Sequence, residues 1–256
     1  MLDRLKAGLG LTRSLVIYRR PGRQRSLRRF YRAFVGPGDR VFDIGAHLGD
    51  RSSAFAALGA HVIALEPQPR LFAWLERLTR RSGRVTCLPL AVGAEPGRLN
   101  LAISRVNLTV SSLSADWRSQ VKSRQAGFAA IDWDESQAVE VTTMDALIER
   151  FGEPDFCKID VEGFEPEVLK GLSRPLKALS VEFVNGALEQ ALACVDRLET
   201  LDAHRYQVVA GERRRFHLDH WVDAQAIRAW FNAGADGLAS GDLYACRASS
   251  PIGDSS

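Results

Sequence analysis

The stretch RVFDIGAHLGDRSSAFAALGAHVIALE, residues 40–66, carries the pattern that decides the fold. It opens with a short apolar run at residues 40–44 and closes with a second one at residues 61–66, and both runs are typical of buried strands. Between them lie a glycine-containing loop and a helical segment, residues 51–58, which ends at Gly59. A strand, a loop, a helix and a second strand form the repeating unit of α/β proteins, so this stretch predicts a parallel sheet.

The same alternation continues toward the C-terminus. Apolar runs predict further strands at residues 84–92, 138–142, 156–161, 178–184, 206–210 and 242–247. Apolar residues at helical spacing predict helices at residues 69–80, 143–151, 165–172, 187–201 and 224–231, the second of them capped by Thr142 and Asp145. The whole pattern predicts an α/β fold with a mostly parallel sheet and helices on both of its faces.

One segment departs from this alternation. Residues 98–104 and 107–113 alternate between apolar and polar side chains, which predicts a β-hairpin inserted after the third strand. Residues 114–137 are mainly polar with three interspersed aromatic residues, and we expect a loop or flap there. The insertion is therefore predicted to add an antiparallel element to an otherwise parallel protein.

Length and composition are those of a folded protein. Of the 256 residues, 46% are hydrophobic and 25% are charged, which excludes disordered, collagen-like and coiled-coil chains. The four cysteines are scattered and form no cluster with histidine, and His217 and His220 lack a third ligand at a suitable spacing, so no metal site is expected. The sequence also lacks an apolar run of about 20 residues and a secretory signal pattern, so we expect a cytoplasmic protein.

Charge is distributed unevenly along the chain. Residues 1–40 hold 11 Lys and Arg residues against two Asp residues, a net charge of +9, and the remainder has a net charge of −6. We expect a basic helical arm at residues 1–35, interrupted near Pro21, whose residues Leu27, Phe30, Tyr31 and Phe34 pack on the main domain. The main domain is predicted at residues 36–248, followed by a flexible tail at residues 249–256. Such an arm suits an anionic membrane surface, which would make the protein peripheral to a membrane, or a phosphorylated glycan carrier. An ordinary solvated face is the structural alternative.

The loop after the first strand predicts the cofactor. Ligands of parallel α/β sheets bind at the carboxyl ends of the strands, where Gly45 permits a tight turn and Gly49 permits close packing of the next helix. Asp43 stands where a dinucleotide fold has its first glycine; a carboxylate there disfavours a pyrophosphate and favours a ligand with a cationic amine. Glu66 ends the second strand, where an acidic side chain accepts hydrogen bonds from ribose hydroxyls. This combination predicts S-adenosylmethionine.

A second group of charged residues follows the central strand, in the sequence KIDVEG at residues 158–163. Strand alternation directs Lys158, Asp160 and Glu162 to one face as the strand reaches the ligand edge. Charged residues on a central strand are either paired with each other or functional, and a Lys–Asp ion pair is the structural alternative. Glu182, at the end of the next strand, is a further candidate.

These segments together resemble the FkbM-type methyltransferases. The resemblance rests on FDIGAHLGD (42–50), IALEP (63–67), AVG (91–93), TMD (143–145) and CKIDVEGFEPEVLKGL (157–172). It implies the seven-stranded, Rossmann-like class I methyltransferase fold with an antiparallel last strand at residues 242–247. It also implies S-adenosylmethionine as the cofactor and O-methylation of a sugar, a glycan or another secondary metabolite.

The cofactor-binding residues expected from the pattern and the resemblance are Asp43, Gly45, Ala46, His47, Gly49, Asp50, Glu66, Pro67, Ala91 and Val92. For catalysis we expect a metal-independent transfer with Asp160 as the base, Glu162 as the second choice, and Lys158 positioning one of them. An NAD(P)-dependent oxidoreductase and a non-catalytic cofactor-binding module are the alternatives. Nucleic acid is not expected as the acceptor, because no base-flipping motif follows the fourth main strand.

Overall fold

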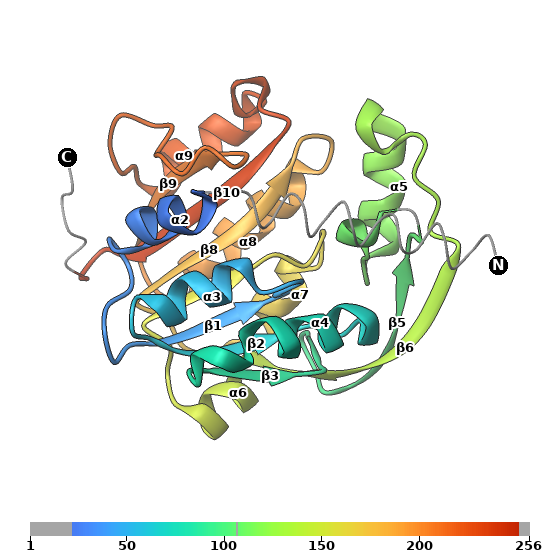
Figure 1. Ribbon diagram of the computed structural model, residues 1–256. Coiled ribbons are helices and arrows are strands. Elements are labelled where there is room, and N and C mark those ends of the chain that lie inside the picture. The colour runs from blue at the N-terminus through green and yellow to red at the C-terminus, as the bar shows by residue number, and fades with distance from the viewer. Residues whose placement is uncertain (1–21, 106, 251–256) are drawn as a thin grey trace.

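The computed structural model describes residues 22–105 and 107–250. Its centre is a seven-stranded sheet with the strand order β3-β2-β1-β7-β8-β10-β9 (Figure 1). The strands are β1 (Arg40–Ile44), β2 (His61–Leu65), β3 (Val85–Leu88), β7 (Phe156–Ile159), β8 (Ala178–Val184), β9 (His204–Ala210) and β10 (Ser240–Arg247). Strand β10 lies antiparallel between β8 and β9, and the other pairs are parallel. The predicted seven-stranded sheet with an antiparallel last strand is confirmed.

Helices cover both faces of this sheet (Figure 1). The helices α2 (Arg23–Tyr31), α3 (Asp50–Ala57) and α4 (Pro69–Thr79) contribute to the core on one face, and α6 (Met144–Phe151), α7 (Glu165–Lys170), α8 (Leu188–Leu201) and α9 (Ala224–Asn232) to the core on the other. Alternate residues of β1 supply the two cores, because successive strand side chains point to opposite faces. Val41 belongs to the first core, and Phe42 and Ile44 belong to the second.

Helix α2 packs on the domain through the residues that its spacing predicts. Leu27 and Tyr31 are buried, and so is Phe34 just beyond the helix end. The Tyr31 ring meets the Phe55 ring edge-on, with the centroids 4.6 Å apart, and the Phe34 ring stacks on the Tyr244 ring at 5.2 Å. The preceding part of the expected arm, residues 1–21, lies outside the described residues, as do residues 251–256 of the expected tail.

The insertion pairs differently from the predicted hairpin. A second sheet has the order β4-β6-β5, formed by β4 (Ala91–Val92), β5 (Gly97–Ile103) and β6 (Glu135–Thr142). The prediction that residues 107–113 pair with residues 98–104 as a strand is therefore wrong, since β5 takes β6 as its antiparallel partner. Among the described residues, the pairing between these two segments is one isolated bridge, from Ala102 to Ser112. The choice has a hydrophobic cause, because buried Val139 and Val141 of β6 share a core cluster with Leu101 and Ile103 of β5.

Three local predictions also need correction. Residues 84–92 are not one strand but two, β3 and β4, which belong to different sheets. The expected loop at residues 114–137 contains α5 (Ala115–Arg124), whose Trp117 and Val121 are buried, and β6 begins within it at Glu135. Helix α6 is capped by Thr143 rather than Thr142, because the Thr143 hydroxyl accepts from the backbone N–H of Ala146 at 3.1 Å.

Short 3₁₀ turns complete the structure: η1 (Arg80–Ser82), η2 (Leu108–Val110), η3 (Ala126–Phe128) and η4 (Ala235–Gly237). Among the described residues, none of the helices has the length and apolar character that crossing a bilayer requires.

Candidate functional site

A cleft opens at the carboxyl ends of β1, β2, β7 and β8, where the topology of a parallel sheet places ligands. Eight of the predicted site residues line it: Gly45, His47, Glu66, Pro67, Ala91, Val92, Asp160 and Glu162. These residues come from segments up to 117 positions apart in the chain, between Gly45 and Glu162. The fold therefore brings the glycine loop and the KIDVEG segment to one site.

Two glycines shape the loop after β1. Gly45 has a φ of +78°, and a Cβ atom there would collide with the backbone carbonyl of Asp160. Gly49 has a φ of +74°, and a Cβ atom there would lie 2.6 Å from Leu75 and 2.8 Å from Thr79 of α4. Gly45 thus lets the loop touch the end of β7, and Gly49 lets α3 pack closely against α4, as the sequence predicts for the second glycine.

Glu66 is held at the centre of the cleft. Its two carboxylate oxygens accept from the backbone N–H groups of His47 and Gln68, each at 2.9 Å, and the side chain is buried. Burial raises the pKa of Glu66 to about 7, although both hydrogen bonds favour the ionised form. Each carboxylate oxygen keeps further lone pairs, so Glu66 can also accept from the hydroxyl groups of a ribose.

His47 lies beside Glu66 in an unusual backbone conformation. Its φ is +51°, in the left-handed region, and its side chain lines the cleft. Burial lowers the pKa of His47 to about 4, so its imidazole is neutral near pH 7.

Five of the predicted site residues lie behind the cleft rather than in its lining. Asp43 is 1% exposed, and its carboxylate accepts from the Ser52 hydroxyl at 2.5 Å. Asp50 accepts from the Arg23 guanidinium at 2.7 Å, which ties the loop to α2. Ala46, Gly49 and Lys158 are likewise absent from the lining. In this structure Asp43 therefore supports the loop from beneath, and its predicted contact with a cofactor amine remains a prediction.

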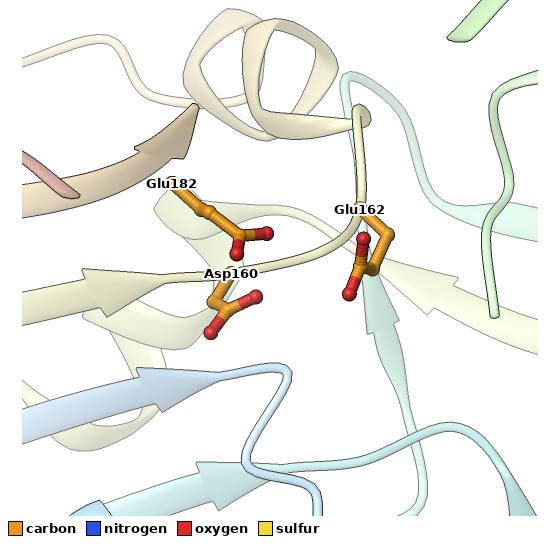
Figure 2. Close-up of side chains that lie close together, drawn as sticks. All are labelled: Asp160, Glu162 and Glu182. Atoms are coloured by element: carbon orange, nitrogen blue, oxygen red, sulfur yellow. The ribbon is translucent and has the colours of Figure 1, made fainter. Parts of the chain in front are cut away.

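Three carboxyl groups converge in the cleft, and their side chains lie close together in Figure 2. They are Asp160, directly after β7, Glu162 in the same loop, and Glu182 on β8; one oxygen from each lies within 4.8 Å of the others. Glu162 has a φ of +54°, so its side chain is presented from a left-handed turn. Adjacent parallel strands ending at one edge bring the three groups together.

Lys158 pairs with one of the three carboxyl groups, so the three differ in their electrostatic surroundings. Its ammonium nitrogen lies 2.6 Å from a carboxylate oxygen of Asp160, and Lys158 is 2% exposed. Burial alone would raise the pKa of Asp160, but the cations of Lys158 and Arg51 outweigh it and lower the pKa to about 2. For Glu162 and Glu182, burial and the charge of Asp160 raise the pKa well above its usual range. The Lys–Asp ion pair is thus present, and two carboxyl groups with a high proton affinity stand beside it.

The same three carboxyl groups are a set that could hold a metal ion. In the part of the chain that the structure describes, His217 and His220 belong to no such set. His217 instead makes a 2.9 Å contact through Nε2 with a carboxylate oxygen of Asp236. Lys158 already neutralises one charge of the carboxyl set, and metal-independent chemistry remains a prediction.

Several lining residues were not predicted from the sequence. Arg51, the second residue of α3, lines the cleft and forms an ion pair with Glu212 at 3.3 Å. The insertion supplies Leu101, Thr109 and Leu113, and Leu71 and Leu90 add further apolar side chains to the lining. Arg51 directly follows the glycine loop, so its position was a usable signal. Leu101, Thr109 and Leu113 carried no such signal, because their place in the lining depends on how distant segments pack.

The strand order, the glycine loop after β1 and the acidic residue directly after β2 are those of the class I, Rossmann-like methyltransferase fold. The sequence model described as Methyltransferase FkbM domain matches residues 43–236. The chain therefore belongs to the FkbM methyltransferase family, and its cofactor is S-adenosylmethionine. Membership of this family decides for the methyltransferase over the NAD(P)-dependent oxidoreductase.

One similar protein of known activity is the hexuronic acid methyltransferase AglP of Haloferax volcanii, 30% identical over 150 residues. The match covers 57% of this chain and about half, 54%, of that protein. Among solved structures, the chain is similar to precorrin-6y C5,15-methyltransferase of Geobacter metallireducens (TM-score 0.46, 13% identity, 88% of this chain and 86% of the other). It is also similar to an S-adenosylmethionine-dependent O-methyltransferase of Thermotoga maritima (TM-score 0.43, 14% identity, 87% and 64%).

Proposed function

We propose that the protein transfers the methyl group of S-adenosylmethionine to an oxygen atom of a sugar or glycan, or of a related small molecule. The observation that carries the proposal is the convergence of Asp160, Glu162 and Glu182 in the same cleft as Glu66 and the glycine loop. The similarity to a hexuronic acid methyltransferase supports a carbohydrate acceptor. Because that match spans only part of each chain, the acceptor is part of the proposal.

The cofactor fits the cleft in one direction. The apolar end, with Leu71, Leu90 and Ala91, suits an adenine ring, and Glu66 in the middle suits the ribose hydroxyls. Arg51 at the other end offers a guanidinium group to a carboxylate. Bound in this way, S-adenosylmethionine supplies an activated methyl group. The residues of the chain then have to orient the acceptor oxygen and take up its proton.

The proton acceptor is assigned to the Glu162–Glu182 pair. Asp160 is neutralised by Lys158, and its low pKa makes it a weak base. Glu162 and Glu182 bind protons more tightly, and a cationic ligand in the cleft favours their ionised forms. When a hydroxyl is methylated, the new O–C bond forms as the S–C bond breaks, and the hydroxyl proton passes to one of these carboxylates.

A labelling experiment tests this function. The protein is incubated with methyl-labelled S-adenosylmethionine and with separate neutral and uronic-acid-containing oligosaccharides. A label released by mild alkali is a methyl ester on a carboxylate, and mass spectrometry of the alkali-stable product tells a methyl ether on a hydroxyl from a methyl group on nitrogen or carbon. We expect label on a carbohydrate oxygen by one of these criteria. Label found on nitrogen or carbon, or on no carbohydrate while a protein or nucleic acid is labelled, would overturn the proposal.

A further inference from the structure

The outward face of α2 carries a stripe of arginines. Arg25, Arg29 and Arg32 follow one another at spacings of four and three, which places them on one side of the helix, opposite buried Leu27 and Tyr31. All three are exposed. The hydrophobic side therefore docks the helix on the domain, and the cationic side faces solvent.

A neighbouring loop extends this stripe. Residues 211–217, between β9 and α9, contain exposed Arg213 and Arg215. The loop is held against α2 by the Phe216 ring, 5.6 Å from the Phe30 ring, and by an ion pair between Glu212 and Arg23 at 3.2 Å. The two segments thus form one surface, the basic face, made of Arg25, Arg29, Arg32, Arg213 and Arg215.

The charges of the basic face are not balanced locally. Within residues 22–105 and 107–250, none of its five arginines forms an ion pair, although Arg23, Arg51 and Arg214 nearby all do. Arg23, Arg51 and Arg214 are therefore engaged in ion pairs within the protein. The five arginines of the basic face remain available to an external anion.

The basic face borders the methyl-transfer cleft. Arg51 and Glu212 line the cleft, and both belong to the ion-pair network that joins α2, α3 and the 211–217 loop. In addition, the Gln24 side chain donates to the backbone carbonyl of Asp50 at 2.8 Å, next to the glycine loop. A partner bound to the basic face would therefore lie beside the cleft.

We infer that the basic face docks on an anionic phospholipid bilayer and holds the cleft beside the membrane surface. A flat anionic leaflet matches a set of exposed arginines spread over a helix and an adjacent loop. The sequence immediately before α2 mixes five further Lys and Arg residues with Leu, Val and Ile, a composition typical of interfacial segments. Leu99 is the only large hydrophobic side chain exposed among the described residues, so attachment through the described surface is electrostatic and reversible. Docking is independent of which oxygen the enzyme methylates.

Sedimentation of the full chain with vesicles tests this inference. We compare vesicles of phosphatidylcholine alone with vesicles that also contain phosphatidylserine, at low and high salt. The variant is R25Q/R29Q/R32Q, and the charge-matched control is R70Q/R80Q/R81Q, which removes three exposed arginines from α4 and η1. Each cation beside an anionic leaflet contributes about a fivefold factor in partitioning, so the variant should bind about 100-fold more weakly at low salt.

The expected result is binding that requires phosphatidylserine, is released by salt, and is lost in the α2 variant but kept in the control. Both variants should retain the thermal midpoint and the S-adenosylhomocysteine affinity of the parent chain. Equal loss in both variants, retention in the α2 variant, or equal binding to neutral vesicles would overturn the inference. So would complete displacement of the protein from vesicles by a stoichiometric amount of RNA, which would identify nucleic acid as the preferred partner.

Discussion

Glu66 links two segments at the predicted cofactor site. Its oxygens already accept from the backbone of the β1 loop and of the residue preceding α4, so the carboxylate is oriented before any ligand binds. The substitution Glu66→Gln keeps one acceptor oxygen but removes the charge that strengthens hydrogen bonds to ribose hydroxyls, each worth about 1.5–3 kcal/mol. We expect at least a tenfold weaker binding of S-adenosylhomocysteine by calorimetry, with Glu76→Gln on the exposed side of α4 as the control. An unchanged dissociation constant would contradict the ribose assignment.

The raised pKa of Glu66 predicts a pH dependence of cofactor binding. In the free protein this pKa is about 7, and ribose hydroxyls that donate to the carboxylate lower it in the complex. Binding therefore releases a proton below pH 7, and the dissociation constant should rise by up to tenfold for each pH unit as the pH falls. Titrations between about pH 6 and pH 8 measure this slope. The Glu66→Gln variant should lose this pH dependence of the dissociation constant. An equal pH dependence in that variant would show that another group releases the proton.

Glu162 and Glu182 are expected to carry the proton-transfer step. The variant E162Q/E182Q preserves the size of both side chains but removes their basicity, so turnover on a hydroxyl acceptor should fall by about 10²–10⁴. The affinity for S-adenosylhomocysteine should stay within about twofold, because Glu66 and the glycine loop are unchanged. The comparison variant Asp160→Asn leaves Lys158 without its partner and should lower thermal stability as well as turnover. Full activity of E162Q/E182Q would return the base to Asp160.

At the scale of elements, the insertion does more than extend the sheet. Ser112, between β5 and α5, is fully buried, and its hydroxyl donates to the backbone carbonyl of Glu162 at 2.6 Å. The segment that the sequence presents as the second strand of a hairpin therefore supports the turn that carries a proton acceptor. Alternation of polar and apolar residues reports which side of a segment is buried. It does not report which segment becomes the partner.

This contact predicts a positioning role for Ser112. The substitution Ser112→Ala removes the hydrogen bond to the Glu162 turn, where φ is +54°. We expect kcat to fall by about tenfold while the KM for S-adenosylmethionine changes little, because the acceptor end is disturbed and the ribose end is not. Ser123→Ala, at an exposed position of α5, is the control and should leave both constants unchanged. A rise in KM with unchanged kcat would show that Ser112 acts on cofactor binding instead.

At the scale of the whole molecule, α2 is part of the domain core. Leu27 and Tyr31 join residues of β1, α3 and β10 in one cluster, so the helix buries the same face of the sheet as α3. The boundary predicted between residues 35 and 36 therefore separates segments that share a core. The charge pattern identifies where the arm is basic, whereas the burial of α2 depends on contacts with β10, more than 200 positions later, such as that between the Phe30 and Tyr244 rings.

Leu27 tests how strongly α2 contributes to stability. The substitution Leu27→Ala leaves a cavity beneath the helix, which should lower the free energy of unfolding by about 2–5 kcal/mol. Leu99→Ala, the same chemical change at a side chain that is 42% exposed, should alter it by less than about 0.5 kcal/mol. Urea denaturation followed by tryptophan fluorescence measures both values. If both variants lowered the free energy of unfolding by a similarly small amount, α2 would be a weakly attached arm.

The sequence by itself determined the type and order of the main elements and eight of the residues that line the cleft. Buried parallel strands appear as continuous apolar runs, and the glycine or acidic residue that ends each run marks the ligand edge, so Gly45, Glu66 and Asp160 were found locally. Tertiary structure alone decided the pairing of β5 with β6, the burial of Asp43 under the loop, and the ion pair that lowers the basicity of Asp160. It also brought Arg51 into the site. The physical reason is that periodicity records only which face of a segment is buried, whereas strand partners and pKa values depend on groups that folding brings together from distant positions.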